Sequence, residues 1–321
     1  MAVVETVRGP VDAQALGTTL MHEHVFVRTE EVQLNYPAGW DEEDRVDDAI
    51  LKLNALASRG CQTIADPTVI GLGRDIRRII RVADGTSLNI IVATGLYTYD
   101  DVPFYFRYRG PGPATGGLDP MARLFIDDLT TGIAGTQVKA AFLKCAIDEP
   151  GMTAGVERVL RAVCQAHAET GAPVTVHTHP GSFSGRAVLD VLRAENADLT
   201  KVVLGHSGDT TDLDYLSELA DAGCLLGMDR FGLDLITPFE DRVGTVAAMC
   251  ERGYADRMVL SHDAACHIDW FPAEVIPRFA PAWHFEHLFD DVLPALRELG
   301  VTESQIQTML VDNPRRYFSG S

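Results

Sequence analysis

The chain has 321 residues, 46% of them hydrophobic and 23% charged, which excludes a disordered chain and predicts a folded protein with a large core. Its formal net charge of −19 repels phosphate groups and anionic lipids, so we expect neither nucleic acid nor a membrane as a partner. The first residues have no basic stretch before an apolar run, and about 18 apolar residues never follow one another, so we expect a cytoplasmic location.

Short β-rich runs and amphipathic helical patterns alternate along the chain. Near the amino terminus, apolar residues alternate around Gly9-Pro10, which predicts a small β-hairpin. Helical patterns include residues 44–60, 154–171 and 211–223. Strands are predicted at 17–25, 61–68, 89–95, 140–147, 173–179, 201–207, 224–231 and 257–264. We therefore predict an α/β fold, a single (β/α)8 TIM barrel over residues 1–321, with the hairpin capping its bottom.

A doubly wound open sheet is the competing fold. It should carry a glycine-rich phosphate turn after its first strand, whereas here the first strand runs into HEHVFVRTEE. Two long connections, residues 96–120 and 265–289, would lie on the carboxyl-terminal face of a barrel, where we expect binding loops. The six cysteines are far apart without a C-x-x-C pair, so we expect buried free thiols.

The first strand carries two histidines one residue apart. Side chains at i and i+2 of a strand point to the same side, so His22 and His24 can reach one point above the barrel mouth, while Glu23 points away. Two such histidines suit a metal ion, but taken alone they are weak evidence, and ordinary polar roles at a strand end explain them better. We predict no catalytic role for Glu23.

Ionisable residues recur at the ends of other predicted strands. Strand interiors of a barrel are normally Val, Ile and Leu, and barrel enzymes keep their chemistry at the carboxyl ends of the strands. Besides the first strand, the fourth, fifth, sixth and eighth strands end with Lys144, His177, His206 and Asp263. Together with His22 and His24 this set exceeds the three protein ligands usual for one catalytic zinc, so we predict a binuclear metal centre at this face.

Lys144 is the unexpected member of the set. An ammonium group with an ordinary pKa of about 10.4 is repelled by divalent cations. If its amine reacts with carbon dioxide, the resulting carbamate is anionic and offers two oxygens that can bridge a pair of metals. The alternative is a lysine at the barrel rim paired with Asp148 or Glu149.

Six motifs in this order, MHEH, LKCA, VHTH, LGHSGD, MDRFG and LSHDA, closely resemble those of the phosphotriesterase-like lactonases of the amidohydrolase superfamily. The resemblance spans essentially the whole chain, and the closing DNPRRYF is similar to that superfamily's last helix. It implies two divalent metal ions per chain (Zn, Fe, Co or Mn), a homodimer, and His179 outside the ligand set. It assigns one metal to His22, His24 and Asp263, the other to His177 and His206, and a bridging position to carboxylated Lys144 together with a hydroxide.

The predicted chemistry is hydrolysis by water that two divalent ions acidify. Asp263 can take the proton of this water and pass it to the leaving oxygen, as a general acid–base. Tyr97 and Arg230 end two further strands, and the resemblance places both near a lactone ring; a rim tyrosine and a surface ion pair are the alternatives. The 265–289 connection supplies apolar side chains for an acyl chain, or for packing against helices: Trp270, Phe271, Ile276, Phe279 and Trp283.

The resemblance implies a quorum-quenching type of lactonase that hydrolyses N-acyl homoserine lactones and other γ- or δ-lactones, with secondary phosphotriesterase (paraoxonase) activity. A dedicated organophosphate phosphotriesterase or an amidase acting on a cyclic amide would use the same metal chemistry. A non-catalytic lactone- or metal-binding receptor is the alternative outside the enzymes. The chain lacks a G-x-S-x-G nucleophile motif, which argues against acyl-enzyme chemistry.

Overall fold

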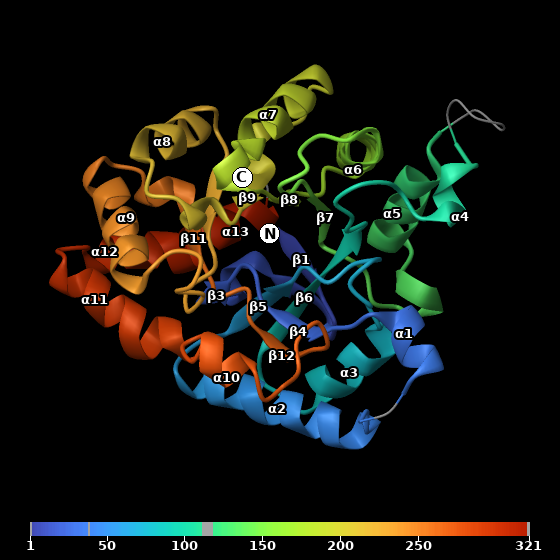
Figure 1. The fold of residues 1–321 in the computed structure, drawn as a ribbon, viewed down its shortest axis with the longest axis horizontal. Coiled ribbons are helices and arrows are strands. Elements are labelled where there is room, and N and C mark those ends of the chain that lie inside the picture. The colour runs from blue at the N-terminus through green and yellow to red at the C-terminus, as the bar shows by residue number, and fades with distance from the viewer. Residues whose placement is uncertain (1, 38, 111–117, 320–321) are drawn as a thin grey trace.

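The computed structural model describes residues 2–37, 39–110 and 118–319. Eight parallel strands form one curved sheet in the order β11-β10-β9-β8-β7-β6-β5-β3, and helices surround it (Figure 1). The (β/α)8 barrel expected from the sequence is therefore confirmed. The barrel strands are β3 (Thr19–Leu20), β5 (Thr63–Asp66), β6 (Asn89–Gly95), β7 (Phe142–Ala146), β8 (Val174–His177), β9 (Val202–Gly205), β10 (Leu225–Met228) and β11 (Met258–Leu260).

The helices around the barrel follow the predicted patterns closely, and several begin at an aspartate. The side chains of Asp41, Asp75 and Asp212 accept hydrogen bonds from backbone N–H groups of the first turn, which stabilises the amino ends of α2, α3 and α8. The main helices are α2 (Glu42–Ser58), α3 (Ile76–Asp84), α5 (Pro120–Thr130), α6 (Ala154–Thr170), α7 (Ser184–Ala194), α8 (Leu213–Asp221), α9 (Phe239–Glu251), α11 (Leu293–Glu298), α12 (Glu303–Gln307) and α13 (Asn313–Ser319).

Apolar side chains fill both the space inside the barrel and the layer between sheet and helices. Within the barrel, Ile91, Phe142 and Val259 belong to one buried cluster with the C-terminal Tyr317. A larger cluster packs the outward-facing strand residues against the helices. All six cysteines are buried free thiols, as expected. No helix within the described ranges has the length and apolar character needed to cross a bilayer.

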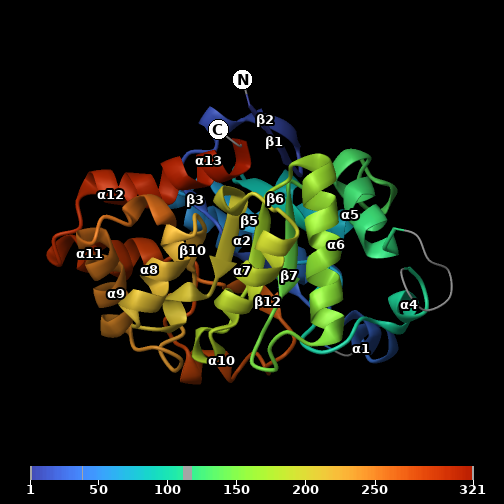
Figure 2. The ribbon, with the colours of Figure 1, turned by 90° about the horizontal axis from the view of Figure 1, so that it is seen from above.

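The amino-terminal hairpin closes the end of the barrel opposite the carboxyl ends of the strands. Strands β1 (Val3–Thr6) and β2 (Gly9–Asp12) pair antiparallel, and Gly9 turns the chain with φ +99°. The Arg8 guanidinium donates to the carbonyl oxygens of Ala83 and Leu88, just before β6. Figure 2 shows β1, β2 and α13 together at one end of the molecule, with α10 (Ile276–Phe279) at the other.

The first predicted strand, residues 17–25, is interrupted in the structure. Strand β3 ends at Leu20, and the chain resumes as β4 (His24–Val27), which pairs in parallel with β12 (Ala265–Ile268). The predicted 265–289 connection thus begins as a strand and also contains α10. Strand β11 ends at Leu260, so among the described residues no regular ladder joins it to β3. We call this gap, residues 21–24 against 261–264, the seam.

Hydrogen bonds of less regular geometry close the barrel at the seam. The Asp263 N–H donates to the His22 carbonyl oxygen (3.0 Å), and the His24 N–H donates to the Ala264 carbonyl oxygen (2.8 Å). The His22 N–H donates to the side-chain oxygen of Ser261 (2.9 Å) instead of to a backbone carbonyl. Loss of the regular ladder frees this part of the chain to place polar side chains over the barrel mouth.

Candidate active site

The predicted metal ligands all lie at the carboxyl ends of the barrel strands, and the structure brings them together. Two of them sit in backbone conformations that non-glycine residues rarely adopt: His206, just after β9, has φ +63°, and Asp263, after β11, has φ +55°. Such conformations are found where function requires a side chain to point in one direction. The other four ligands come from β4, β7, β8 and the three residues between β3 and β4.

One group of ligand atoms is formed by His22, His24 and Asp263. The Asp263 Oδ1 lies 3.3 Å from His22 Nε2 and 3.2 Å from His24 Nε2. The three ligand atoms lie within 4.8 Å of one another, close enough to hold a single ion. This is the first of the two sets expected from the sequence, and its nitrogen and oxygen donors suit zinc and its neighbours in the transition series.

The remaining predicted ligands face this group. His206 Nε2 lies 2.9 Å from His177 Nδ1 and 3.9 Å from Asp263 Oδ2. Lys144 Nζ lies 3.3 Å from His22 Nε2 and is fully buried. Because Asp263 presents one oxygen to each group of histidines, the donor set fits two neighbouring cations.

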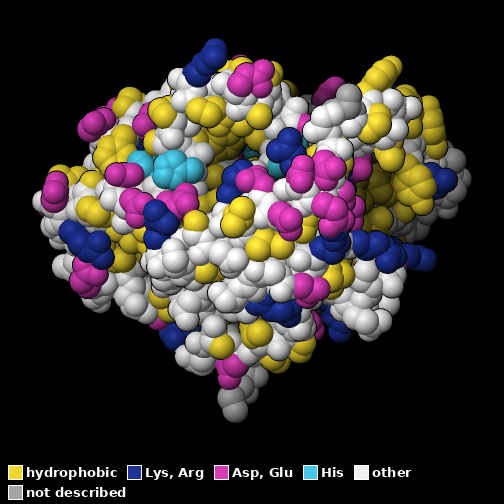
Figure 3. Space-filling view, turned by 90° about the horizontal axis from the view of Figure 1, so that it is seen from below, with side chains coloured by type: hydrophobic (Ala, Val, Ile, Leu, Met, Phe, Trp, Pro, Cys, Tyr) yellow, Lys and Arg dark blue, Asp and Glu magenta, His cyan; other side chains and the backbone are white. Residues whose placement is uncertain are grey.

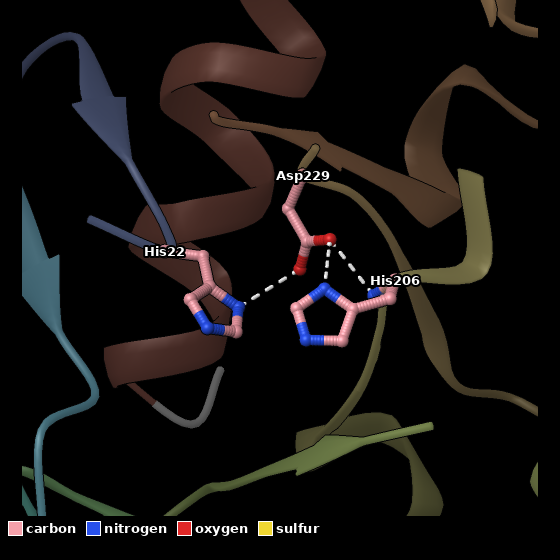
Figure 4. Close-up of side chains that lie close together, drawn as sticks. All are labelled: His22, His206 and Asp229. Atoms are coloured by element: carbon pink, nitrogen blue, oxygen red, sulfur yellow. Dashed lines mark hydrogen bonds and ion pairs between the residues drawn. The ribbon is translucent and has the colours of Figure 1, made fainter. Parts of the chain in front are cut away.

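Asp229 orients a histidine from each group. Its Oδ2 lies 2.9 Å from His22 Nδ1, and its Oδ1 accepts from the backbone N–H of His206 (2.8 Å) and lies 2.9 Å from His206 Nδ1 (Figure 4). The three residues are close enough to hold an ion themselves. However, their distances are those of ordinary hydrogen bonds, and these bonds leave both Nε2 atoms facing the other ligands.

The other two histidines also have a partner behind them. His24 Nδ1 lies 2.7 Å from the Thr68 hydroxyl, which in turn donates to Asp66. His177 Nε2 lies 2.5 Å from Asp148 Oδ2, so its Nδ1 faces His206. Each imidazole is therefore held by one nitrogen and presents the other to the site, as is usual for histidines that bind metals.

Burial sets the protonation of the site. It lowers the pKa of His22, lowers that of His177 to about 4, and lowers that of His206 well below its usual value, which keeps the imidazoles neutral and able to bind cations. Burial also lowers the pKa of Lys144 to about 8, so part of its amine is neutral near physiological pH.

Among the described residues, no carboxylate oxygen lies within 4.0 Å of Lys144 Nζ, and Asp148 pairs with His177 instead. The alternative of a rim lysine paired with Asp148 or Glu149 is therefore not what the structure has. A buried amine without a counter-ion is unusual, because burial without a partner disfavours the charged form.

Arg230 and Tyr97 lie beside the metal ligands. The Arg230 Nε donates to Asp263 Oδ2 (3.0 Å) and its Nη1 donates to Asp209 (2.9 Å), so its ion pairs are in the site and not on the surface. Burial opposes the charge of Arg230, but Asp209 and Asp263 hold its pKa above the usual value. Burial raises the pKa of Tyr97 well above the ordinary value, so the phenol stays a neutral donor.

A cavity of about 530 Å³ opens above this cluster. The predicted residues Trp270, Phe271, Phe279 and Trp283 line it, whereas Ile276 does not and Val275 takes its place. Sequence reasoning also missed the other wall, which comes from β4, the turn after β5 and the connection after β10: Val27, Leu72, Leu233, Leu235 and Ile236. The cavity is thus polar at its floor and apolar around its sides.

The remaining histidines lie outside this cluster. His179 bonds to Ser182, His167 of α6 bonds to the Ala172 backbone carbonyl just after this helix, and His267 packs against Trp40. His262 faces away from the ligands, as its position next to Asp263 predicts, and its Nδ1 lies 2.6 Å from Glu23 Oε1.

Comparison with known proteins follows the same lines as the geometry. The model of the phosphotriesterase family matches residues 2–318. The chain belongs to the phosphotriesterase family. Members of this family are metal-dependent hydrolases with binuclear centres, and this structure has histidine and aspartate groups that could hold a metal ion.

Three relatives of the family illustrate the match. A solved structure described as the phosphotriesterase from Mycobacterium tuberculosis is 58% identical, covers 98% of each chain and superposes with a TM-score of 0.97. An aryldialkylphosphatase of Saccharolobus solfataricus is 40% identical over 96% of this chain and 97% of its own. A structure from the molecular engineering of organophosphate hydrolysis activity from a weak promiscuous lactonase template is 32% identical, covers 99% and 100% of the two chains, and has a TM-score of 0.88.

Proposed function

We propose that this member of the family is a binuclear metal-dependent lactonase. The observation that carries the proposal is the cavity, whose floor holds the metal ligands with Tyr97 and Arg230 and whose sides are apolar. A lactone with an alkyl tail has the same division, since its ring ester is polar and its chain is not. N-acyl homoserine lactones and other γ- and δ-lactones are the substrates that we propose.

In this proposal two divalent cations, when bound, acidify water and polarise the carbonyl oxygen of the ester. Carbon dioxide adds to the neutral amine of Lys144, forming an N–C bond and releasing a proton, and the carbamate supplies the anionic bridge. We assign the ligands as follows: His22, His24 and Asp263 would hold one ion, His177 and His206 would hold the other, and carboxylated Lys144 would serve both.

Three side chains would carry the remaining chemistry. Burial would raise the pKa of Asp263, but His22 and His206 beside it hold that pKa well below the usual value, so Asp263 is ionised and can accept a proton from water. It can pass this proton to the ring oxygen as the ester bond breaks. Tyr97 and Arg230 offer a neutral and a cationic donor that would orient the lactone over the site.

Phosphotriester hydrolysis is the secondary activity in the proposal. The relative named aryldialkylphosphatase supports it, as does the structure engineered for organophosphate hydrolysis from a lactonase template. A tetrahedral phosphorus centre can use the same acidified water, but the apolar walls give a compact phosphotriester less to bind than an acyl chain.

A substrate panel tests the proposal. Protein of measured metal content is assayed for kcat/KM with acyl homoserine lactones of several chain lengths, with simple γ- and δ-lactones, with a cyclic amide and with paraoxon. We expect the highest kcat/KM on a lactone. A higher value for paraoxon would instead indicate a dedicated phosphotriesterase, a higher value for the amide an amidase, and two bound metals without any turnover a receptor.

We further propose a cytoplasmic homodimer that binds neither nucleic acid nor membranes. Exposed apolar side chains support the dimer. Leu34 and Tyr36, in and just after α1 (Glu30–Asn35), and Phe104 and Tyr108, in and just after α4 (Phe104–Arg107), are each more than half exposed. Figure 3 shows hydrophobic side chains gathered toward one edge of a face on which acidic and basic groups are otherwise mixed. Light scattering at several concentrations measures the assembly directly.

A further inference from the structure

Glu23 lies between two metal ligands in the sequence but faces away from the cavity. Its side chain is completely buried in the seam, where it meets residues 262–264 that follow β11. Glu23 Oε1 accepts from the backbone N–H of His262 (2.9 Å), and Glu23 Oε2 accepts from the backbone N–H of Ala264 (3.2 Å). The carboxylate therefore occupies the place where a neighbouring strand would offer backbone carbonyls.

A third donor reaches the same carboxylate from the His262 ring. The Leu288 backbone N–H donates to His262 Nε2 (2.9 Å), so the ring proton must sit on Nδ1. Nδ1 lies 2.6 Å from Glu23 Oε1 and donates to it. Three N–H groups thus converge on Glu23, and both of its carboxyl oxygens act as acceptors.

Asp263 lies between the two residues whose N–H groups end on Glu23. With φ +55° it holds a left-handed conformation that is uncommon for a non-glycine residue, and the surrounding contacts keep it there. The backbone N–H of Asp263 itself donates to the His22 carbonyl oxygen. Glu23 therefore fixes the turn on both sides of the residue that faces both groups of histidines.

We propose that Glu23 is a positioning residue, which holds the Asp263 carboxylate against His22 and His24 by clamping the backbone on either side of it. The inference builds on the proposed metal site but is independent of the substrate class. The H-E-H sequence would then have two roles. Its two histidines would bind the metal from one side of the chain, and its glutamate would fix the opposing ligand, Asp263, from the other side.

The test compares two substitutions at Glu23 with a matched destabilised variant. Glu23→Gln keeps the size but replaces one acceptor oxygen by an NH2 group, which then faces an N–H donor. Glu23→Asp keeps the carboxyl group but shortens the side chain by one methylene, which moves both oxygens away from their N–H donors. Ile306→Ala is the control, since Ile306 is buried in α12, away from the seam, and its loss lowers stability without touching the site.

Metal retention is measured on metal-loaded protein as the rate of zinc loss to a chelator, together with Tm, kcat and KM on any hydrolysed ester. For Glu23→Gln we expect metal loss about tenfold faster or more, a comparable fall in kcat, and KM within about twofold, with Glu23→Asp intermediate. Ile306→Ala should lower Tm without changing metal loss. Wild-type protein that holds no metal would refute the proposed function instead.

Wild-type metal retention and kcat in Glu23→Gln, whatever its Tm, would overturn the positioning role. If Glu23→Gln does not fold, Glu23→Asp decides in the same way. Failure of both variants to fold would also overturn the proposal, because Glu23 would then be required for closing the barrel and not for aiming Asp263.

Discussion

Replacing Asp229 by asparagine tests the inference that one carboxylate orients a ligand of each metal. Asp229 is 1% exposed and receives His22 Nδ1, His206 Nδ1 and the His206 backbone N–H. Asparagine preserves the shape but keeps only one oxygen, so its NH2 group must face one of the imidazole N–H groups. That imidazole loses its acceptor and is free to turn or to change tautomer.

The magnitude follows from the bonds that change. A hydrogen bond to a charged group contributes about 1.5–3 kcal/mol, and both imidazole bonds lose the charge of their acceptor. Loss of an outer partner of a metal ligand typically costs about 10–100-fold in metal affinity or activity, which corresponds to about 1.4–2.8 kcal/mol. We expect losses in this range at each metal position, because the proposal assigns His22 and His206 to different ions.

The assay measures metal content after dialysis against graded chelator concentrations, together with kcat/KM on the best lactone. Asp214→Asn is the matched control, because this exposed aspartate in α8 pairs with Arg252 and lies outside the site. Wild-type affinity for both metals in Asp229→Asn would refute the orienting role. Loss of one metal with the other unaffected would refute the claim that Asp229 serves both.

Three further predictions concern charge, pocket and pH. Lys144→Ala should reduce activity by more than about 100-fold and regain part of it with added acetate or propionate, whereas full activity with two metals and no added acid would contradict the carbamate. Phe279→Ala removes a ring that packs on Phe271 in the cavity wall, so kcat/KM should fall about tenfold for long-chain lactones and little for short ones; an equal loss for both would contradict acyl-chain binding. Burial lowers the pKa of His262 from 6.5 to about 3, so the unfolded state gains a proton before the folded state does as pH falls. The free energy of unfolding should therefore decrease by about 1.4 kcal/mol per pH unit below pH 6.5. Urea denaturation that gives the same free energy of unfolding at pH 7 and at pH 5 would contradict this.

The strand and helix pattern was enough to predict the barrel, because strand periodicity and helix ends are local properties of the sequence. The candidate ligands could also be predicted from the sequence, since parallel strands bring their carboxyl ends to one face wherever the strands begin. The break after Leu20 could not be predicted, because it depends on Ser261 replacing a backbone partner and on β12 pairing with β4. Both contacts join residues more than 200 positions apart in the sequence.

The residues behind the histidines were also missed. Asp229 directly precedes Arg230 at the end of β10, and Asp148 follows β7 by two positions, so both lie at strand ends, as the predicted ligands do. Their partners, however, are set by the angle at which each imidazole enters the site. The sequence carries no local pattern for that angle.

The first and last elements of the chain lie at the end of the barrel opposite the candidate active site. The hairpin β1–β2 and α13 lie together at the end opposite α10 (Figure 2), and Phe279 of α10 lines the cavity. A solid support or a fused carrier attached through either segment would therefore leave the mouth open to solvent. The orientation suits immobilised catalysts and sensors, in which an enzyme must be anchored without blocking the entry of its substrate.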